Sequence, residues 1–92
     1  MPYATWEDET SYSNGDKQRI PNTWMLKLPW IILCVHRHIH YEPDQWLLGC
    51  AQLGIDKHEL EAKDIKDAQA EALKYATAMC QNYLTSLKKA RP

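Results

Sequence analysis

The hydrophobic pattern of this 92-residue chain changes its period near Asp64, and that change limits the folds open to it. Between residues 24 and 53 the apolar residues form short runs, rich in Trp, Ile, Val and Leu and interrupted by Pro and Gly. After Asp64 they recur every three or four positions. Runs of the first kind are typical of strands, and the later spacing is typical of an amphipathic helix. The chain is therefore predicted to be α+β, with its strands first and one long helix last.

Three to four strands are expected ahead of the helix. Residues 23–28 form a strand-like segment ended by Pro29, and residues 30–41, WIILCVHRHIHY, form the strongest strand. Glu-Pro-Asp at 42–44 predicts a hairpin tip, because Pro presets φ and Asp bonds its own backbone, and residues 45–53 then form the return strand. Residues 57–63 are ambiguous: a capping-box pattern favours a helix, but the period-two alternation favours a short strand, which we prefer.

The helix is predicted over residues 64–89, with Asp64 as its N-cap. Acidic residues stand at its start and basic residues at its end, which complements the helix dipole. The fold class that follows is a two-layer α+β domain, an antiparallel meander of three to four strands packed on this one helix. Residues 1–22 are polar and predict a mobile or loosely docked arm, so the domain itself spans residues 23–92.

Composition bears on compartment and partner class. No apolar run approaches the roughly 20 residues that span a bilayer, so no membrane association is expected. The 11 basic residues nearly balance the 12 acidic ones, which argues against a strongly basic nucleic-acid-binding arm. Cys34, Cys50 and Cys80 are an odd number of widely spaced cysteines, and the N-terminus lacks the features of a secretory signal. A cytoplasmic protein with reduced thiols is expected.

Three histidines carry most of the chemical interest. His36, His38 and His40 alternate along the second predicted strand and would project from one face. A hairpin loop of two or four residues places them beside Leu47, Gly49 and Ala51, and a loop of three residues places them beside Trp46, Leu48 and Cys50. The sequence does not decide between these registers. The interaction face that we predict corresponds to the second register and consists of His36, His38, His40, Trp46 and Leu48.

This face favours association with protein. A sheet covered by one helix leaves its other face open, and an apolar face of that width is unfavourable in water. The predicted function is a non-enzymatic interaction module that uses this face for homodimerisation or for docking on a larger protein. In a further interpretation the N-terminal arm covers the face with Trp6 or Trp24, and the histidines are ordinary surface residues.

Two alternatives concern ligands. Alternating histidines with a cysteine suit zinc, and His36, His38 and Cys50 are the candidate ligands, although no second ligand cluster follows them. His, Arg and Trp on a sheet face can also stack nucleic-acid bases, but the near-neutral charge opposes this. Apart from this zinc alternative, no metal ion or other cofactor is expected.

Catalysis is disfavoured. A histidine such as His36, His38 or His58 would need a carboxylate beside it in a cleft, and Glu42 and Asp44 at the predicted hairpin tip lie close to His40. No motif of a hydrolase, a nucleotide-binding loop or a metalloprotease is present. We therefore predict that the protein is not an enzyme.

The strand–strand–strand–helix order over residues 30–88 resembles half of a double-stranded-RNA-binding domain and the small antitoxin-type domains. The resemblance is one of layout and includes no family motif, so it implies a fold and no function. In size and style the chain also resembles the small accessory proteins that bacteriophages and prophages encode, which implies a host-directed or assembly-linked binding role.

Overall fold

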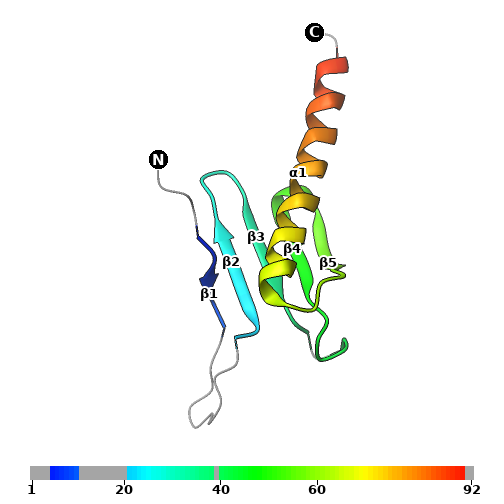
Figure 1. Ribbon diagram of the computed structural model, residues 1–92. Helices are drawn as coiled ribbons and strands as arrows, with labels where there is room; N and C mark the ends of the chain where they lie inside the picture. The colour runs from blue at the N-terminus through cyan, green and yellow to red at the C-terminus, as the bar shows by residue number, and fades with distance from the viewer. Residues whose placement is uncertain (1–4, 11–20, 39, 91–92) are drawn as a thin grey trace.

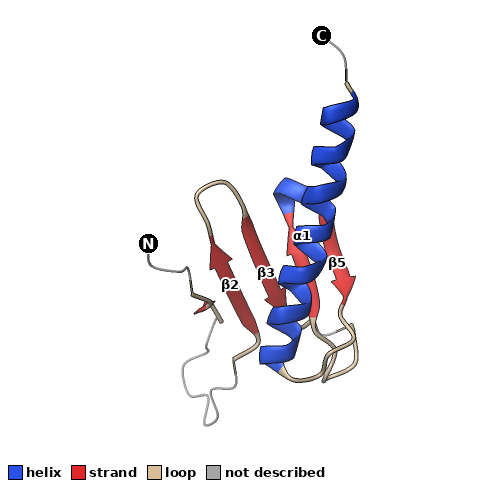
Figure 2. Ribbon diagram, turned by 45° about the horizontal axis from the view of Figure 1, so that its top comes forward, coloured by secondary structure: helices blue, strands red, loops and turns tan. Residues whose placement is uncertain are grey.

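One antiparallel sheet and one long helix make up the described part of the chain. The computed structural model describes residues 5–10, 21–38 and 40–90. Within these residues the sheet has five strands in sequential order. The strands are β1 (Glu7–Asp8), β2 (Thr23–Lys27), β3 (Ile32–His36), β4 (Leu47–Cys50) and β5 (Ile55–Glu59). The helix α1 (Ile65–Lys89) lies across one face of the sheet (Figures 1 and 2). The predicted two-layer α+β fold is confirmed, with five strands instead of three to four.

The helix begins where its sequence predicts. The Asp64 carboxylate accepts hydrogen bonds from the backbone N–H groups of Lys66 and Asp67, at 3.1 and 3.3 Å. These bonds satisfy two of the donors that every helix leaves free at its start. Ala68, Ala72 and Ala76 are buried against the sheet, because small side chains let the helix backbone approach closely. No helix in the described part of the chain is long and apolar enough to cross a membrane.

One edge of the sheet comes from the segment predicted as an arm. β1 pairs with β2, with Glu7 opposite Met25 and Asp8 opposite Trp24. Thr10 extends this pairing, because its hydroxyl oxygen accepts from the backbone N–H groups of both Asn22 and Thr23. Residues 1–4 and 11–20, the rest of that segment, lie outside the described residues.

The predicted strands are shorter than their apolar runs. The run over 30–41 is a strand only over β3, and the return strand is β4 followed by a 3₁₀ turn, η1 (Ala51–Leu53). Gly54 ends that turn in the left-handed region, with φ of 68°, which glycine adopts without strain. The strand expected over 57–63 is β5, which begins and ends earlier in the chain.

A bulge in β5 changes which of its residues face the helix. Leu48 pairs with His58 and Cys50 pairs with Ile55, so the register shifts between them. Lys57 takes up the shift with a φ of 51°, which is uncommon for a residue other than glycine. Ile55 and His58 therefore both point to the helix side, where the His58 ring stacks on Tyr75 of α1 with centroids 4.0 Å apart.

The core lies between the sheet and the first half of α1. Its central side chains come from β2, β3 and β4, from the residues just before β4 and just after β5, and from the helix alanines: Leu26, Leu33, Val35, Trp46, Leu48, Leu60, Ala68, Ala72 and Ala76. Trp6 and Trp24 pack against the edge of this cluster. Trp6 and Trp24, which one interpretation of the sequence placed over the other face, thus lie on the helix side.

Candidate functional site

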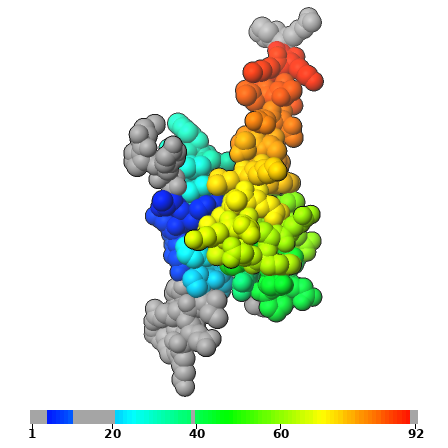
Figure 3. All heavy atoms as spheres, in the orientation of Figure 1, coloured from blue at the N-terminus to red at the C-terminus, as the bar shows by residue number. Residues whose placement is uncertain are grey.

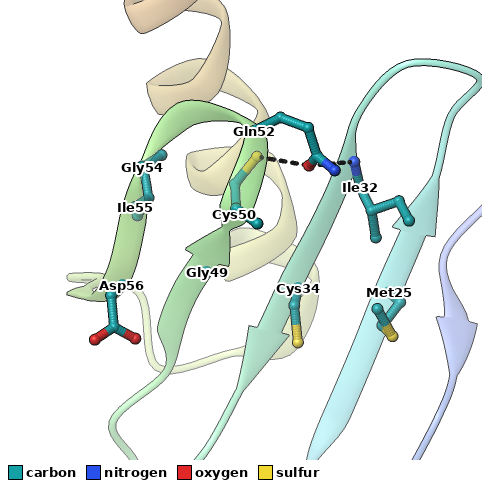
Figure 4. A pocket seen from close by; sticks show the side chains of 10 residues that line it. Met25, Ile32, Cys34, Gly49, Cys50, Gln52, Gly54, Ile55 and Asp56 are labelled. Carbon is teal, nitrogen blue, oxygen red and sulfur yellow. Dashed lines mark hydrogen bonds between the residues drawn. The ribbon is translucent and has the colours of Figure 1, made fainter.

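The face of the sheet that points away from α1 is the candidate site, and we call it the open face. Side chains alternate along a strand, so the residues between the core positions belong to this face. It consists of Glu7 on β1, Thr23, Met25 and Lys27 on β2, Ile32, Cys34 and His36 on β3, Leu47 and Gly49 on β4, and Glu59 on β5. Leu47 is fully buried although it points to this side. In Figure 4, which looks onto this face, the helix lies behind the sheet.

The β3–β4 register corrects part of the predicted interaction face. Cys34 lies opposite Gly49 and His36 opposite Leu47, so the histidine side of the sheet contains Leu47 and Gly49. Trp46 and Leu48 lie on the helix side and are 2% and 0% exposed. The strand pairing stops at His36 and Leu47, and the intervening residues form a long connection in place of the expected three-residue tip.

Trp46 has a structural position under the helix. Its indole N–H donates to the backbone carbonyl of Lys63, at 2.9 Å, just before the helix begins. The Arg37 guanidinium lies over the ring, 4.4 Å from its centroid. A buried indole with its N–H satisfied and a cation over its face is a packing anchor of the core. It is not available to a partner on the open face.

Only one of the three predicted histidines belongs to a strand. His36 is the last residue of β3, and Arg37 leaves the β3–β4 pairing, with its backbone N–H donating to the carbonyl of Asn22. His38 and His40 lie in the connection that follows, with ring centroids 5.0 Å apart. His38 accepts a hydrogen bond there at Nδ1 from the backbone N–H of His40. The row of histidines expected on one strand face is therefore not formed.

His36 is packed across the floor of the open face. A Cβ placed on Gly49 would lie 3.7 Å from His36 Nε2, so the imidazole lies over the glycine. Burial lowers the pKa of His36, and the nearby Lys57 ammonium acts in the same direction, while a hydrogen bond with the Arg37 backbone and the Asp56 carboxylate oppose the shift. The neutral His36 imidazole, packed on Gly49, therefore shapes the wall of the site and does not act as a freely titrating group.

The predicted metal ligands are not brought together. Cys50 is 3% exposed at the end of β4, where its thiol contacts Gln52 Oε1 at 3.6 Å, whereas His36 pairs with Leu47 at the other end of that strand. In the described part of the chain no three His, Cys, Asp or Glu side chains gather in an arrangement that could hold a metal ion.

Two of the histidines considered for acid–base chemistry lie on opposite faces of the sheet. His58 stacks on the helix while His36 is on the other face, and Asp44, at the tip of the β3–β4 connection, lies 3.8 Å from Lys63. The absence of catalysis itself stays a prediction.

A shallow apolar depression occupies one end of the open face (Figure 4). Its volume is about 640 Å³, and its lining comes from β2, β3, β4, η1 and β5, with Met25, Ile32, Cys34, Gly49 and Gln52 among the residues. Because Gly49 has no side chain, it does not fill the floor of the depression. Gln52 holds one wall, since its Oε1 accepts from the backbone N–H of Ile32 at 3.2 Å. Burial of the half-buried Cys34 thiol raises its pKa, so it behaves here as a small apolar group.

The lysine on the β2 part of the open face is paired with carboxylates. Lys27 forms ion pairs with Glu7 and Glu9 of the β1 segment, and these carboxylates raise its pKa. A lysine held by two carboxylates offers little to a phosphate backbone. The nucleic-acid alternative therefore gains no support from this side of the sheet.

The sequence indicated the open face but not its central residues. Met25, Ile32, Cys34 and Gly49 line the depression, and none of them is in the predicted interaction face. The alternation of side chains along β2 could have indicated Met25, because Trp24 and Leu26 point to one face of the sheet and Met25, which lies between them, points to the other. No protein-family model, curated protein or solved structure matches this chain.

Proposed function

We propose that this protein is a non-enzymatic interaction module that docks on a larger protein through the open face of its sheet. The observation that supports the proposal is the apolar depression of about 640 Å³ on that face. A concave apolar surface of this size can accept an apolar side chain of a partner, while polar groups at its rim form hydrogen bonds with the partner. A cytoplasmic setting and an origin in a phage or prophage are part of the proposal and rest on sequence alone.

The depression has the composition of a protein interface more than that of a catalytic cleft. Met25, Cys34 and Ile32 are polarizable or branched apolar groups, and Ile32 is 36% exposed. Methionine adapts its shape to a partner, and contiguous exposed apolar surface on a small domain marks a binding site. Trp6 and Trp24 pack on the helix side, so in the described residues neither of them covers this surface.

Charge favours a protein partner over a nucleic acid. The chain has 11 basic and 12 acidic residues, and the lysine nearest the β1 edge is held by Glu7 and Glu9. Nucleic-acid binding depends on unpaired cations that displace counterions from phosphates. A neutral, apolar surface gains its affinity from burial instead.

Site-specific photo-crosslinking tests this proposal. A photoreactive amino acid replaces Ile32 on the open face, and in a control chain it replaces Lys66, an exposed residue near the helix start. In cells that naturally make the protein, we expect a crosslinked product from position 32 and not from position 66. The Gly49→Leu substitution should abolish that product, because leucine fills the depression and its Cβ has room beside His36.

The crosslinked mass separates the outcomes. A product larger than twice the 10.7 kDa chain identifies a foreign partner, and its loss in the folded Gly49→Leu variant supports docking at the depression. No product from position 32, or equal products from both positions, would overturn the proposal.

A further inference from the structure

A small pocket lies on the helix side of the sheet, at the end of the molecule where α1 begins. Figure 3 shows the first half of α1, in yellow, packed on the body of the molecule, while its second half, in orange and red, projects from it. The pocket has a volume of about 280 Å³, and its walls combine indole rings with charges of both signs: Trp24, Trp46, Arg37, Lys63 and Asp64. None of its described lining residues belongs to the apolar depression on the open face, so the two sites are separate.

The Arg37 guanidinium is held in a fixed place in this pocket. The backbone N–H of Arg37 donates to the Asn22 carbonyl at 2.9 Å, which anchors the residue at the end of the β2–β3 pairing. The guanidinium lies over the Trp46 ring, 4.4 Å from its centroid, and the indole is itself fixed by its hydrogen bond to the Lys63 carbonyl. Stacking uses the face of the guanidinium. Its N–H donors lie in the guanidinium plane, so stacking leaves them free to bind an anion.

The protein does not supply an anion for this arginine. Arg37 Nε is buried and has no hydrogen-bond partner. Among the described residues no Asp or Glu forms an ion pair with Arg37, and the ion pairs found there involve Lys27 and Lys63. A partly buried guanidinium without an anion is uncommon, because the loss of hydration and the unmade hydrogen bonds are both unfavourable. A ligand that brings a negative charge would remove both costs.

The charges of the pocket favour a ligand with a single negative charge. Arg37 and Lys63 are positive and Asp64 is negative, so two positive charges and one negative charge line the pocket. The Asp64 carboxylate already accepts two backbone N–H groups at the start of α1, and it would repel a second negative charge on a ligand. Lys63 is only loosely paired with Asp44, at 3.8 Å and with both side chains more than half exposed, so it can turn to a ligand at little cost.

We propose that this pocket binds a carboxylate attached to an aromatic or other apolar group, with the Arg37 guanidinium as its main contact. The terminal Nη groups of an arginine can donate two parallel hydrogen bonds to the two oxygens of a carboxylate. The apolar part of the ligand packs against Trp24 and Ile65, which also line the pocket. A volume of about 280 Å³ accepts one side chain or a small organic acid. This site goes beyond the proposed function because it uses the helix side and leaves the open face free.

Titration of the full-length wild-type chain with phenylacetate, followed by NMR of the indole N–H signals, tests this site. We expect the signals of Trp24 and Trp46 to shift and saturate, with a dissociation constant of the order of 1 mM for a ligand of this size. The signal of Trp30, which is 91% exposed and outside the pocket, should stay in place. Phenylacetamide has the same shape without the charge and should bind at least about tenfold more weakly. Phenyl phosphate, with nearly two charges, should bind no more tightly than phenylacetate.

Variants of Arg37 give the second test. Arg37→Gln removes the charge and should weaken phenylacetate binding at least about tenfold, whereas Arg37→Lys keeps the charge without the two parallel donors and should fall between Arg37→Gln and wild type. Lys74→Gln is the matched control, because it removes one positive charge from an exposed position of α1 outside the pocket, and binding should be unchanged. Circular dichroism checks that each variant is folded. The comparison of the acid with its amide needs no variant, so it decides the case even if Arg37→Gln does not fold.

A capped dipeptide of phenylalanine and glutamate, whose side-chain carboxylate is its only charge, distinguishes two sources of the ligand. Tighter binding of the dipeptide than of phenylacetate supports a protein side chain as the ligand, and weaker binding supports a small organic acid. The inference fails if phenylacetate gives no saturable shift up to about 20 mM, if phenylacetamide binds equally well, if phenyl phosphate binds more tightly, or if folded Arg37→Gln binds phenylacetate like wild type. Crosslinking from Ile32 reports on the other face of the sheet, so the two proposals can fail separately.

Discussion

The placement of Trp46 in the core leads to a prediction that separates a packing role from a binding role. Trp46→Phe removes the indole N–H, leaving the Lys63 carbonyl without its 2.9 Å donor, and it leaves a void where the second ring was. Loss of a hydrogen bond to a partly buried group costs about 1–2 kcal/mol, and the void adds about 1 kcal/mol. We expect the free energy of unfolding to fall by about 2–3 kcal/mol.

For a chain of this size that loss corresponds to a melting temperature lower by roughly 10–20 °C. Urea and thermal unfolding followed by far-ultraviolet circular dichroism measure both quantities. Trp30→Phe is the matched control, because Trp30 is 91% exposed and its ring should contribute less than about 0.5 kcal/mol. A loss below about 0.5 kcal/mol for Trp46→Phe, or an equal loss for the two variants, would refute the packing role.

Three further predictions concern the helix start, pH and thiol reactivity. Asp64→Ala should lower the free energy of unfolding by about 1 kcal/mol, whereas Asp64→Asn should keep most of the wild-type stability, because an asparagine side chain can still cap the helix. Equal urea midpoints for Asp64→Ala and wild type would contradict the capping role. Burial lowers the pKa of His36, so the unfolded chain binds more protons than the folded one and stability should fall as pH drops below about 6.5. His36→Gln should flatten that dependence in urea titrations, and an unchanged slope would count against it. Burial raises the pKa of the Cys34 thiol, so peptide mapping after brief alkylation near pH 8 should find exposed Cys80 modified first; the reverse order would exclude this.

The helix could be predicted closely because its signals are local. Asp64 caps it, the apolar period continues to Leu87, and the last turn is basic, so α1 begins one residue after its predicted cap and ends at the predicted residue. Each of these features depends on residues within a few positions of one another.

The histidine face could not be predicted because it depends on pairing between distant residues. Strand β3 ends at His36 because its partner β4 begins only at Leu47, and nothing near His38 or His40 in sequence records that. The parity of the register decides whether Trp46 faces the helix or the open side. Length and composition of a loop do not determine that parity, so two registers remained open until the pairing was known.

The bulge at Lys57 shows the same limit on a smaller scale. The sequence alternates regularly through Lys57, His58 and Glu59, which predicts one uninterrupted strand face. The chain instead inserts a residue with positive φ, so that His58 reaches Tyr75 and Ile55 still reaches the core. A positive φ at lysine costs energy that only tertiary packing can offset, and a single sequence does not contain that information.

The exposed second half of α1 could have been predicted from the sequence by comparing the lengths of the helix and the strands. The apolar period of α1 predicts a buried face over its whole length, including Tyr83 and Leu87. A strand of about five residues can cover little more than about 17 Å, so a helix of roughly 37 Å must leave its second half without a sheet beneath it. Apolar residues that recur past the end of the sheet need a different cover. In this chain Leu84 and Leu87 lie on that uncovered half and are exposed, so the mismatch in length between the two layers explains why they are not part of the core.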